Sequence, residues 1–266
     1  MATRKPDPSR GFSNEEIAKI LELVKAADSV EIKLAVPMTA HRATVQSLGL
    51  DPVEAQPRQV FFFDTPELAL NQAGLVVRAR RIQGGRGDTV IKLRPVDPAV
   101  IDEELRRSSA FNVEVDVLPG QFVCSASLKG RCTAQEVLDV DTGTAPVSSL
   151  FSKEQRAFYK EHAPAGVEMN SLLALGPTFL LRAKLRPTEL DRRLVVEMWL
   201  YPDGSRSLEI STKAAPAEAF QVAAELRTYL TNCGIEIGGG QQTKTKAALE
   251  FFKADLASSG PGTVAK

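Results

Sequence analysis

The feature that most constrains the fold is the stretch from Gln59 to Pro95, which predicts an aromatic strand, a short connection and a β-hairpin with one basic face. Side chains alternate between the two faces of a strand, so every second residue points the same way. Small or apolar residues separate the cations and are expected to face a packed layer. The run from Gly84 to Asp88 predicts the turn, because glycine reaches the positive φ values that hairpin loops need. The cations of the basic face are Arg78, Arg80, Lys92 and Arg94.

A short repeat links this hairpin to the second half of the chain. The tetrapeptide Lys92 to Pro95 recurs as Lys184 to Pro187, and Arg182 adds a further cation on the same face. Like charges repel, so a basic face is stable only in water or when anions neutralise it. One interpretation is therefore a solvated outer face of a sheet. The repeat favours another, in which two similar halves close around a common centre. The carboxylates that follow the basic strands are Glu114, Asp116, Glu197 and Glu209.

Further motifs around the hairpin resemble those of the CYTH superfamily, also called triphosphate tunnel metalloenzymes. The matching residues are Phe63-Asp64-Thr65-Pro66, Leu70, Gly74, the R-x-R of residues 78–80 and the K-x-R of residues 92–94. The similarity runs from about Val30 to about Phe252. The family includes inorganic triphosphatases, thiamine triphosphatases and class IV adenylyl cyclases. The resemblance implies an α+β fold, a closed antiparallel β-barrel tunnel with flanking helices. Its lumen would hold a triphosphate among Lys and Arg side chains, with glutamates binding a divalent metal.

Two serines stand where the family has carboxylates. The predicted first strand, from Val30 to Val36, carries Glu31 and Lys33 on one face, and the family reads E-x-E-x-K here. Ser29 occupies the place of the first glutamate. Likewise, Ser211 replaces the second glutamate of a late E-x-E strand. These replacements leave open the alternative that the protein binds triphosphates without hydrolysing them.

The resemblance carries the following roles over to this chain. The residues expected to be catalytic are Glu31, Lys33, Arg78 and Arg186. Those expected to bind substrate are Lys33, Arg78, Arg80, Lys92, Arg94, Arg182, Lys184, Arg186 and Lys246, with Lys244 as the alternative to Lys246. The metal ligands are expected to be Glu31, Glu114, Asp116, Glu197 and Glu209. Oxygen ligands of this kind suit Mg²⁺ or Mn²⁺, which are hard cations.

These roles predict a metal-dependent triphosphatase that acts on inorganic or organic triphosphates. In such an enzyme cations and metal stabilise charge on the transferred phosphoryl group while a water attacks in line. One alternative is an adenylyl cyclase, in which the ribose 3′-hydroxyl replaces the water. A second is a polyphosphate- or nucleotide-binding module without turnover. The partner is expected to be a triphosphate-containing small molecule or polyphosphate, and a homodimer is left open.

Composition argues against several other classes of protein. The 266 residues contain 33 Lys plus Arg and 33 Asp plus Glu, so no global field attracts nucleic acid or a membrane. The sequence also lacks a long apolar run and a secretory signal, which together predict a cytoplasmic protein. We expect one domain over residues 14–257, flanked by disordered segments at 1–13 and 258–266.

Helical signals occur outside the predicted strands. Ser13 and Glu16 have capping-box spacing before a helix over residues 14–27. A second such box starts at Thr133, and further helices are expected over residues 217–232 and 242–256. Thr39 is expected to cap a short helix that ends near Gly49, and Asp64 to bind backbone N–H groups.

Overall fold

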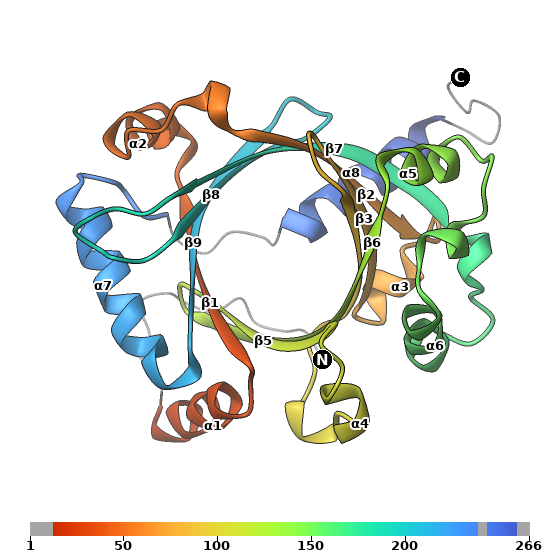
Figure 1. The fold of residues 1–266 in the computed structure, drawn as a ribbon, viewed down its shortest axis with the longest axis horizontal. Helices are drawn as coiled ribbons and strands as arrows, with labels where there is room; N and C mark the ends of the chain where they lie inside the picture. The colour runs from red at the N-terminus through yellow and green to blue at the C-terminus, as the bar shows by residue number, and fades with distance from the viewer. Residues whose placement is uncertain (1–12, 239–243, 260–266) are drawn as a thin grey trace.

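The structure, a computed structural model, describes residues 13–238 and 244–259. Within these residues nine strands close into one barrel, in the order β1-β5-β6-β4-β3-β2-β7-β8-β9, and β9 pairs back onto β1 (Figure 1). The predicted closed tunnel with flanking helices is therefore confirmed. The strands are β1 Ser29–Val36, β2 Gln56–Asp64, β3 Leu75–Ile82, β4 Gly87–Leu93, β5 Phe111–Leu118, β6 Gln121–Cys132, β7 Leu173–Leu185, β8 Leu194–Leu200 and β9 Arg206–Ala214.

The barrel is not antiparallel throughout, which corrects the predicted strand directions, while the closed α+β tunnel is as predicted. β1 pairs with β5 in parallel, from Ser29 opposite Glu114 to Ile32 opposite Val117. All other neighbours in the ring are antiparallel. Directions that alternate around a closed ring require an even number of strands. Nine strands therefore need at least one parallel pair, and β1 and β5 supply it.

Helices cover the outside of the barrel and one part of its interior (Figure 1). α7 packs on β1 and β9 through a buried stripe of Ala219, Val222, Leu226 and Leu230, whose spacing follows the helical period. α5 and α6 contact the β3, β4 and β6 side. The helices are α1 Asn14–Lys25, α2 His41–Ser47, α3 Ala69–Gln72, α4 Glu103–Arg106, α5 Ala134–Asp141, α6 Lys153–His162, α7 Ala219–Asn232 and α8 Lys244–Ser259.

Strand β2 shows how alternation divides the core into two layers. Phe61 and Phe63 point outward and join the large cluster beneath the surface helices, where the rings of Phe63 and Phe151 meet edge to face. Val60 and Phe62 point inward and pack with Leu180, Trp199 and three apolar residues of α8. The start of α8 therefore lies across the barrel opening in Figure 1 because it fills an apolar part of the interior.

The capping predictions are confirmed at three places and wrong at one. Both capping boxes form, at Ser13 and at Thr133. Asp64 accepts hydrogen bonds from the backbone N–H groups of Thr65, Leu70 and Asn71 at 2.7–3.0 Å. Thr39 does not cap a helix, because it lies inside the short 3₁₀ helix Met38–Ala40 that leads into α2.

The ends of several elements differ from the sequence prediction. α1 ends at Lys25, two residues before the predicted end of its helix at residue 27. The predicted disordered tail begins too early, because α8 continues to Ser259. The rest of that tail and residues 1–12 of the predicted disordered N-terminus lie outside the described residues.

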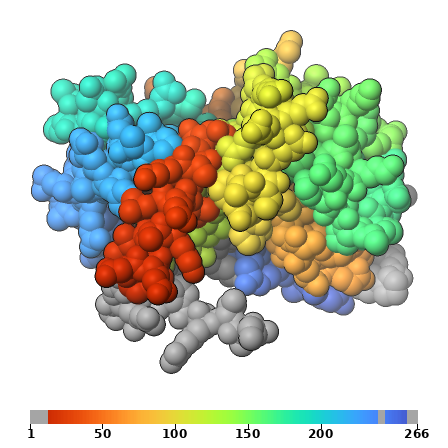
Figure 2. Space-filling view, turned by 90° about the horizontal axis from the view of Figure 1, so that it is seen from below, coloured from red at the N-terminus to blue at the C-terminus, as the bar shows by residue number. Residues whose placement is uncertain are grey.

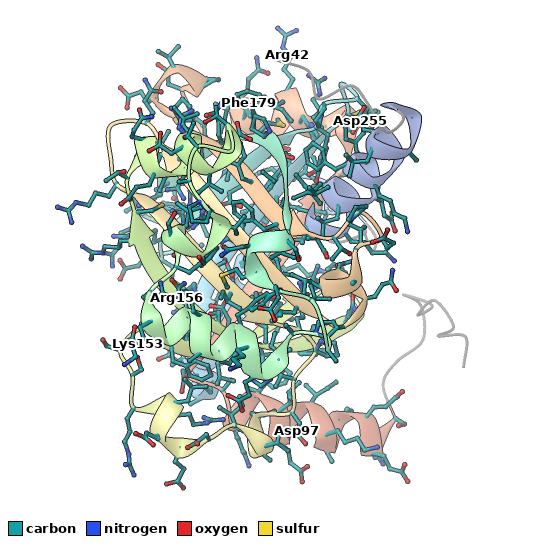
Figure 3. The ribbon with its side chains drawn as sticks, turned by 90° about the vertical axis from the view of Figure 1, so that its right-hand side faces the viewer. Arg42, Asp97, Lys153, Arg156, Phe179 and Asp255 are labelled. Carbon is teal, nitrogen blue, oxygen red and sulfur yellow. The ribbon has the colours of Figure 1, made fainter. Side chains whose placement is uncertain are left out.

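Two surfaces help to orient the molecule. Figure 2 shows α1, in red, beside the yellow segment that contains α4, and Arg106 joins them by donating a hydrogen bond to the carbonyl of Ala26 at 3.2 Å. Figure 3 shows Lys153 and Arg156 of α6 at the outer surface, together with Phe179 of β7. Among the described helices, none combines the length and the apolar character needed to cross a membrane.

Candidate active site in the barrel interior

The barrel encloses a cavity of about 830 Å³ that is lined by charged side chains. These side chains occupy the inward positions of strands from both halves of the chain. The predicted cations that line the cavity are Lys33, Arg78, Arg80, Lys92, Arg94, Arg182 and Lys246. The predicted carboxylates that line it are Glu31, Glu114, Glu197 and Glu209. The structure therefore brings eleven of the sequence-predicted residues to one enclosed space, together with the alternative Lys244.

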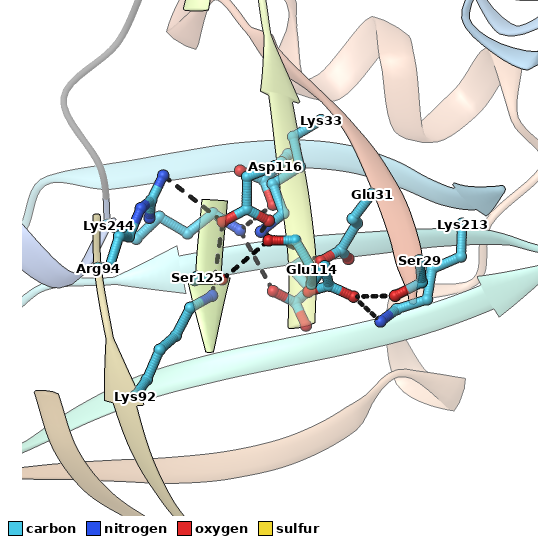
Figure 4. Close-up of polar contacts among 12 residues, drawn as sticks. Ser29, Glu31, Lys33, Lys92, Arg94, Glu114, Asp116, Ser125, Lys213 and Lys244 are labelled. Atoms are coloured by element: carbon cyan, nitrogen blue, oxygen red, sulfur yellow. Dashed lines mark hydrogen bonds and ion pairs between the residues drawn. The ribbon is translucent and has the colours of Figure 1, made fainter. Parts of the chain in front are cut away.

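Asp116 is fully buried at the centre of a cluster of cations (Figure 4). Its Oδ1 atom lies 2.7 Å from Lys33 Nζ, and its Oδ2 atom lies 3.5 Å from both Lys92 Nζ and Arg94 Nη2. Burial alone would raise the pKa of Asp116, but Lys33, Lys92 and Arg94 hold it well below its usual range. Burial also opposes the charge of Lys33, yet Asp116, Glu31 and Glu209 together raise the pKa of this lysine. Asp116 is therefore a fixed anion that holds three cations in place.

Gly74 positions Arg94 beside Asp116. The backbone N–H of Arg94 donates to the Gly74 carbonyl at 2.7 Å, directly after β4 ends. Gly74 has a φ of +77°, and a Cβ atom here would lie 2.6 Å from the Arg94 carbonyl oxygen. Only glycine tolerates both conditions. This close approach explains why a glycine separates the predicted aromatic strand from the hairpin.

Three carboxylates gather around this point from two paired strands. Glu31 of β1 and Glu114 and Asp116 of β5 each offer an oxygen atom, and these atoms all lie within 4.8 Å of one another. Lys33 also lies 3.1 Å from Glu31, while Glu114 accepts a hydrogen bond from Ser29 Oγ at 3.2 Å and pairs with Lys213 of β9. Hard oxygen donors at this spacing fit Mg²⁺ or Mn²⁺. We call the side formed by β9, β1 and β5 the carboxylate wall, with Glu31, Lys33, Glu114, Asp116 and Lys213.

The other two predicted metal ligands form a separate group. Glu197 and Glu209 face each other across β8 and β9, and Lys244 Nζ lies 3.2 Å and 2.7 Å from their carboxylate oxygens. Arg182 Nε lies 3.3 Å from Glu197. Although burial opposes it, Lys244 and then Arg182 lower the pKa of Glu197 to about 2. Among the described residues, the three-carboxylate group contains neither Glu197 nor Glu209.

Lys244, named above as the alternative to Lys246, reaches into the interior. Its ammonium lies 5.3 Å from the centre of the Trp199 ring as well as beside the two glutamates. Lys246 also lines the cavity, but its ammonium pairs with Glu250 of the same helix at 3.8 Å. Trp199 donates to Glu197 at 3.3 Å and is 4% exposed, which makes it part of the packed interior.

On the opposite side of the ring, β3, β2 and β7 form what we call the arginine wall, with Arg58, Arg78, Arg80 and Arg182. Arg80 makes two hydrogen bonds to Asp88 at 2.7 and 2.8 Å. Arg78 has no hydrogen-bond or ion-pair partner among the described residues, and its Nε atom is buried. Burial, followed by the neighbouring Arg80, lowers the pKa of Arg78 to about 9. Cationic charge therefore exceeds its protein counter-charge on this wall.

Four residues outside the main predicted set also shape the site: Arg58, Asp88, Lys213 and Lys244. No role in the site was predicted for the first three. Arg58 is 7% exposed, and burial together with Arg80 and Arg182 lowers its pKa to about 10. The sequence did contain a sign that Arg58 points inward, because it shares every second position along the strand with the inward-pointing Val60 and Phe62. Alternation alone could not identify the inward face of an aromatic strand that is buried on both sides.

Two predicted substrate-binding residues lie away from the cavity lining. Lys184 follows Arg182 on the same face of β7, but its side chain is exposed near the end of the strand. Arg186 comes after β7 ends at Leu185, is exposed, and pairs with Asp191 at 2.9 Å. The predicted alternation is correct for Arg182 and Lys184. The strand, however, leaves the enclosed part of the barrel before it reaches the last two cations.

Comparisons with known proteins address the fold. No family model matches the chain. A curated protein, the peroxisomal 2,4-dienoyl-CoA reductase of Mus musculus, is 26% identical over 132 residues, which are 48% of this chain. The chain spans only 42% of the length of that reductase, and so limited a match establishes no family.

Several solved structures match most of this chain, and two of them have TM-scores above 0.5. One is a candidate adenylyl cyclase from Hippeastrum, HpAC1, described as having a dominant triphosphatase activity. It shares 19% identity, covers 83% of this chain and 95% of its own, and has a TM-score of 0.61. The other is a candidate adenylate cyclase from Bacillus halodurans, with 13% identity, coverage of 83% and 97%, and a TM-score of 0.58. The chain therefore has the fold of these structures, the closed tunnel that its resemblance to the CYTH superfamily predicted.

Proposed function

We propose that this chain is a metal-dependent triphosphatase of the CYTH superfamily, which hydrolyses inorganic or organic triphosphates inside the barrel. Arg78 is the observation that carries the proposal. Arg78 is half-buried with its Nε atom fully buried, and a guanidinium in this position without a protein partner is costly unless an anion binds it. Its neighbours on the arginine wall include no carboxylate paired to it among the described residues. A phosphate chain would supply the missing negative charge.

The arginine wall supports the binding part of this proposal. Arginine presents a planar group of N–H donors that match phosphate oxygens in pairs. Arg78 and Arg80 lie on β3 and Arg182 on β7, the two strands that flank β2, and all three line the same cavity. We infer that they hold two or more phosphoryl groups of the substrate and stabilise the charge that develops as the terminal group is transferred.

The carboxylate wall supports the metal part. Glu31, Glu114 and Asp116 would hold the ion, because their oxygens are close enough to share one cation. When bound, Mg²⁺ or Mn²⁺ would neutralise phosphate charge and lower the pKa of a water molecule. Lys33, Lys92 and Arg94 are held at the same place by Asp116, so they can orient the reacting phosphoryl group from the protein side. The walls face each other across the cavity, which would place substrate between cations and metal.

An adenylyl cyclase reaction is the second candidate, because the Hippeastrum and Bacillus halodurans structures carry that description. It would use the same phosphate-binding residues and differ in the nucleophile. A third candidate is binding without turnover. It is favoured by the serines at positions 29 and 211 and by the ion pairs that already occupy every carboxylate of the carboxylate wall.

A product-resolved assay separates the three candidates. The full chain would be incubated with tripolyphosphate, thiamine triphosphate or ATP, with Mg²⁺ or Mn²⁺, and the products separated by ion exchange. Release of orthophosphate supports the triphosphatase, whereas cyclic AMP with pyrophosphate supports the cyclase. Binding of tripolyphosphate by calorimetry without any product at any metal concentration would leave only the binding module.

Matched arginine variants connect the activity to the barrel interior. Arg78→Met should lower kcat/KM by roughly 100-fold or more, since the loss of one preorganised donor to a charged transition state has effects of this size. Arg42→Met removes the same charge from the exposed face of α2, away from the cavity, and should leave the rate unchanged. Equal rates for the two variants would show that the activity does not depend on the arginine wall.

A further inference from the structure

Glu114 has a counter-ion that differs from those of the other two carboxylates. Lys213 lies on β9 directly opposite Glu31 of β1, and its ammonium pairs with Glu114 Oε2. The same oxygen accepts the hydrogen bond from Ser29 Oγ (Figure 4). Glu114 itself is 8% exposed. One oxygen of the proposed metal site is therefore already bound to two protein groups.

The ion pairs of the carboxylate wall separate into fixed and loose contacts. Lys33 has a side chain that is 18% exposed and bridges Glu31 and Asp116, so removing it would leave two carboxylates without that charge. Lys213 has a side chain that is 54% exposed, and among the described residues its ion pair is with Glu114 alone. Its flexible four-carbon stem can carry the ammonium into water at little cost.

An ammonium and a divalent cation compete for the negative charge of the same carboxylate. Two positive charges a few ångströms apart repel each other strongly in a partly buried site. Glu114 can therefore contribute fully to a metal only after Lys213 has moved away. Of the cations that contact the three carboxylates, Lys33, Lys92, Arg94 and Lys213, the last has the most exposed side chain and is the one that can most readily give way when a metal arrives.

We propose that Lys213 is a built-in competitor for the metal: it neutralises Glu114 in the metal-free protein and is displaced into solvent when a divalent ion binds. This inference rests on the metal site of the proposed function and assigns Lys213 a specific part in it. Lys213 would set the metal concentration at which the site fills. It would also keep Glu114 from remaining an uncompensated buried charge when no metal is present.

Direct measurement of Mn²⁺ binding tests the proposal without relying on activity. Mn²⁺ would be titrated into the full chain, with free Mn²⁺ followed by electron paramagnetic resonance. Lys213→Met should bind Mn²⁺ about tenfold more tightly than wild type, an effect of the size seen when groups around a metal site are altered. Lys213→Arg keeps the charge and should stay close to wild type. Lys153→Met removes one charge from the outer surface of α6 (Figure 3) and should also behave as wild type.

Thermal melting provides a second readout, because the Lys213→Met variant should be less stable than wild type without metal and should gain more stability when metal is added. Without metal, Lys213→Met should melt at a lower temperature than wild type, because Glu114 loses its counter-ion. Saturating Mn²⁺ should raise the melting temperature of this variant more than that of wild type. Lys153→Met should show neither difference.

Each contrary result has a definite meaning. Equal or weaker Mn²⁺ binding by Lys213→Met overturns the competitor role while leaving the metal site of the proposed function intact. No detectable Mn²⁺ binding by wild type and variant alike overturns both the competitor role and the metal requirement. The phosphate assay described above then decides independently whether the barrel binds triphosphates.

Discussion

The arginine wall and the carboxylate wall face each other across one cavity, yet they balance charge in opposite ways. On the carboxylate wall every carboxylate has a cation at 2.7–3.5 Å or in direct contact, and Asp116 is surrounded by three. On the arginine wall Arg80 and Arg182 have acidic partners, whereas Arg78 has none among the described residues. The charges of the carboxylate wall are therefore paired within the protein, whereas the arginine wall keeps one cation without a protein partner among the described residues.

This difference shows which part of the barrel interior is built for stability and which for binding. A buried ion-pair cluster holds its members in a fixed geometry, but it gains little from a new ligand unless one partner leaves. An unpaired buried cation lowers the stability of the empty protein and gains most from an incoming anion. The predictions below test that contrast, beginning with the largest expected effect.

Removing the central anion of the carboxylate wall should destabilise the protein strongly. Asp116→Asn leaves Lys33, Lys92 and Arg94 close together without their common partner. We expect a loss of about 2–3 kcal/mol in the free energy of unfolding, somewhat less than for a fully buried pair because the cations are partly exposed. Urea denaturation measures it. Asp191→Asn, which breaks the exposed pair with Arg186, should barely shift the midpoint. Similar shifts for both variants would contradict the idea of a structural cluster.

Removing the unpaired cation of the arginine wall should stabilise the ligand-free protein, which is the opposite of the effect expected for Asp116→Asn. Arg78→Met retains much of the apolar stem and removes a charge that burial already disfavours. We expect the melting temperature of the ligand-free protein to rise, by about 2–4 °C for each kcal/mol gained. Tripolyphosphate should stabilise wild type and not the variant. A clear drop in the melting temperature would mean that Arg78 has a structural partner and would remove the basis for the contrast.

The repeated tetrapeptide offers the smallest and most specific test. Lys92 contacts Asp116 in the cavity, whereas Lys184 is exposed beyond it. Lys92→Met should lower kcat/KM for tripolyphosphate about tenfold, equivalent to ~1.4 kcal/mol of transition-state stabilisation. Lys184→Met should cost clearly less. Steady-state kinetics on the two variants make the comparison, and equal losses would return Lys184 to the substrate-binding set.

Local patterns allowed much of the structure to be predicted. Alternation along the strands correctly placed Arg78 with Arg80 and Glu114 with Asp116, and capping boxes located the starts of α1 and α5. These features depend on residues within a few positions of one another, which is why a linear sequence reports them. Resemblance to a known family then supplied the closed barrel.

The sequence could not separate the five predicted metal ligands into two groups or exclude Arg186 from the cavity. Both outcomes depend on where strands end and on which strands become neighbours around the ring. Lys213 and Glu114 are far apart in the chain, as are Lys244 and Glu209. No local pattern links such pairs.

By itself, the sequence determined which side chains share a face, because strand geometry fixes the direction of every second residue. Only the tertiary structure decided which of those charges are neutralised. The free energy of a charge depends on its burial and on the partners within a few ångströms, and these are set by closure of the barrel. The same closure leaves Arg78 without a partner and gives Glu114 a lysine from a strand almost a hundred residues away.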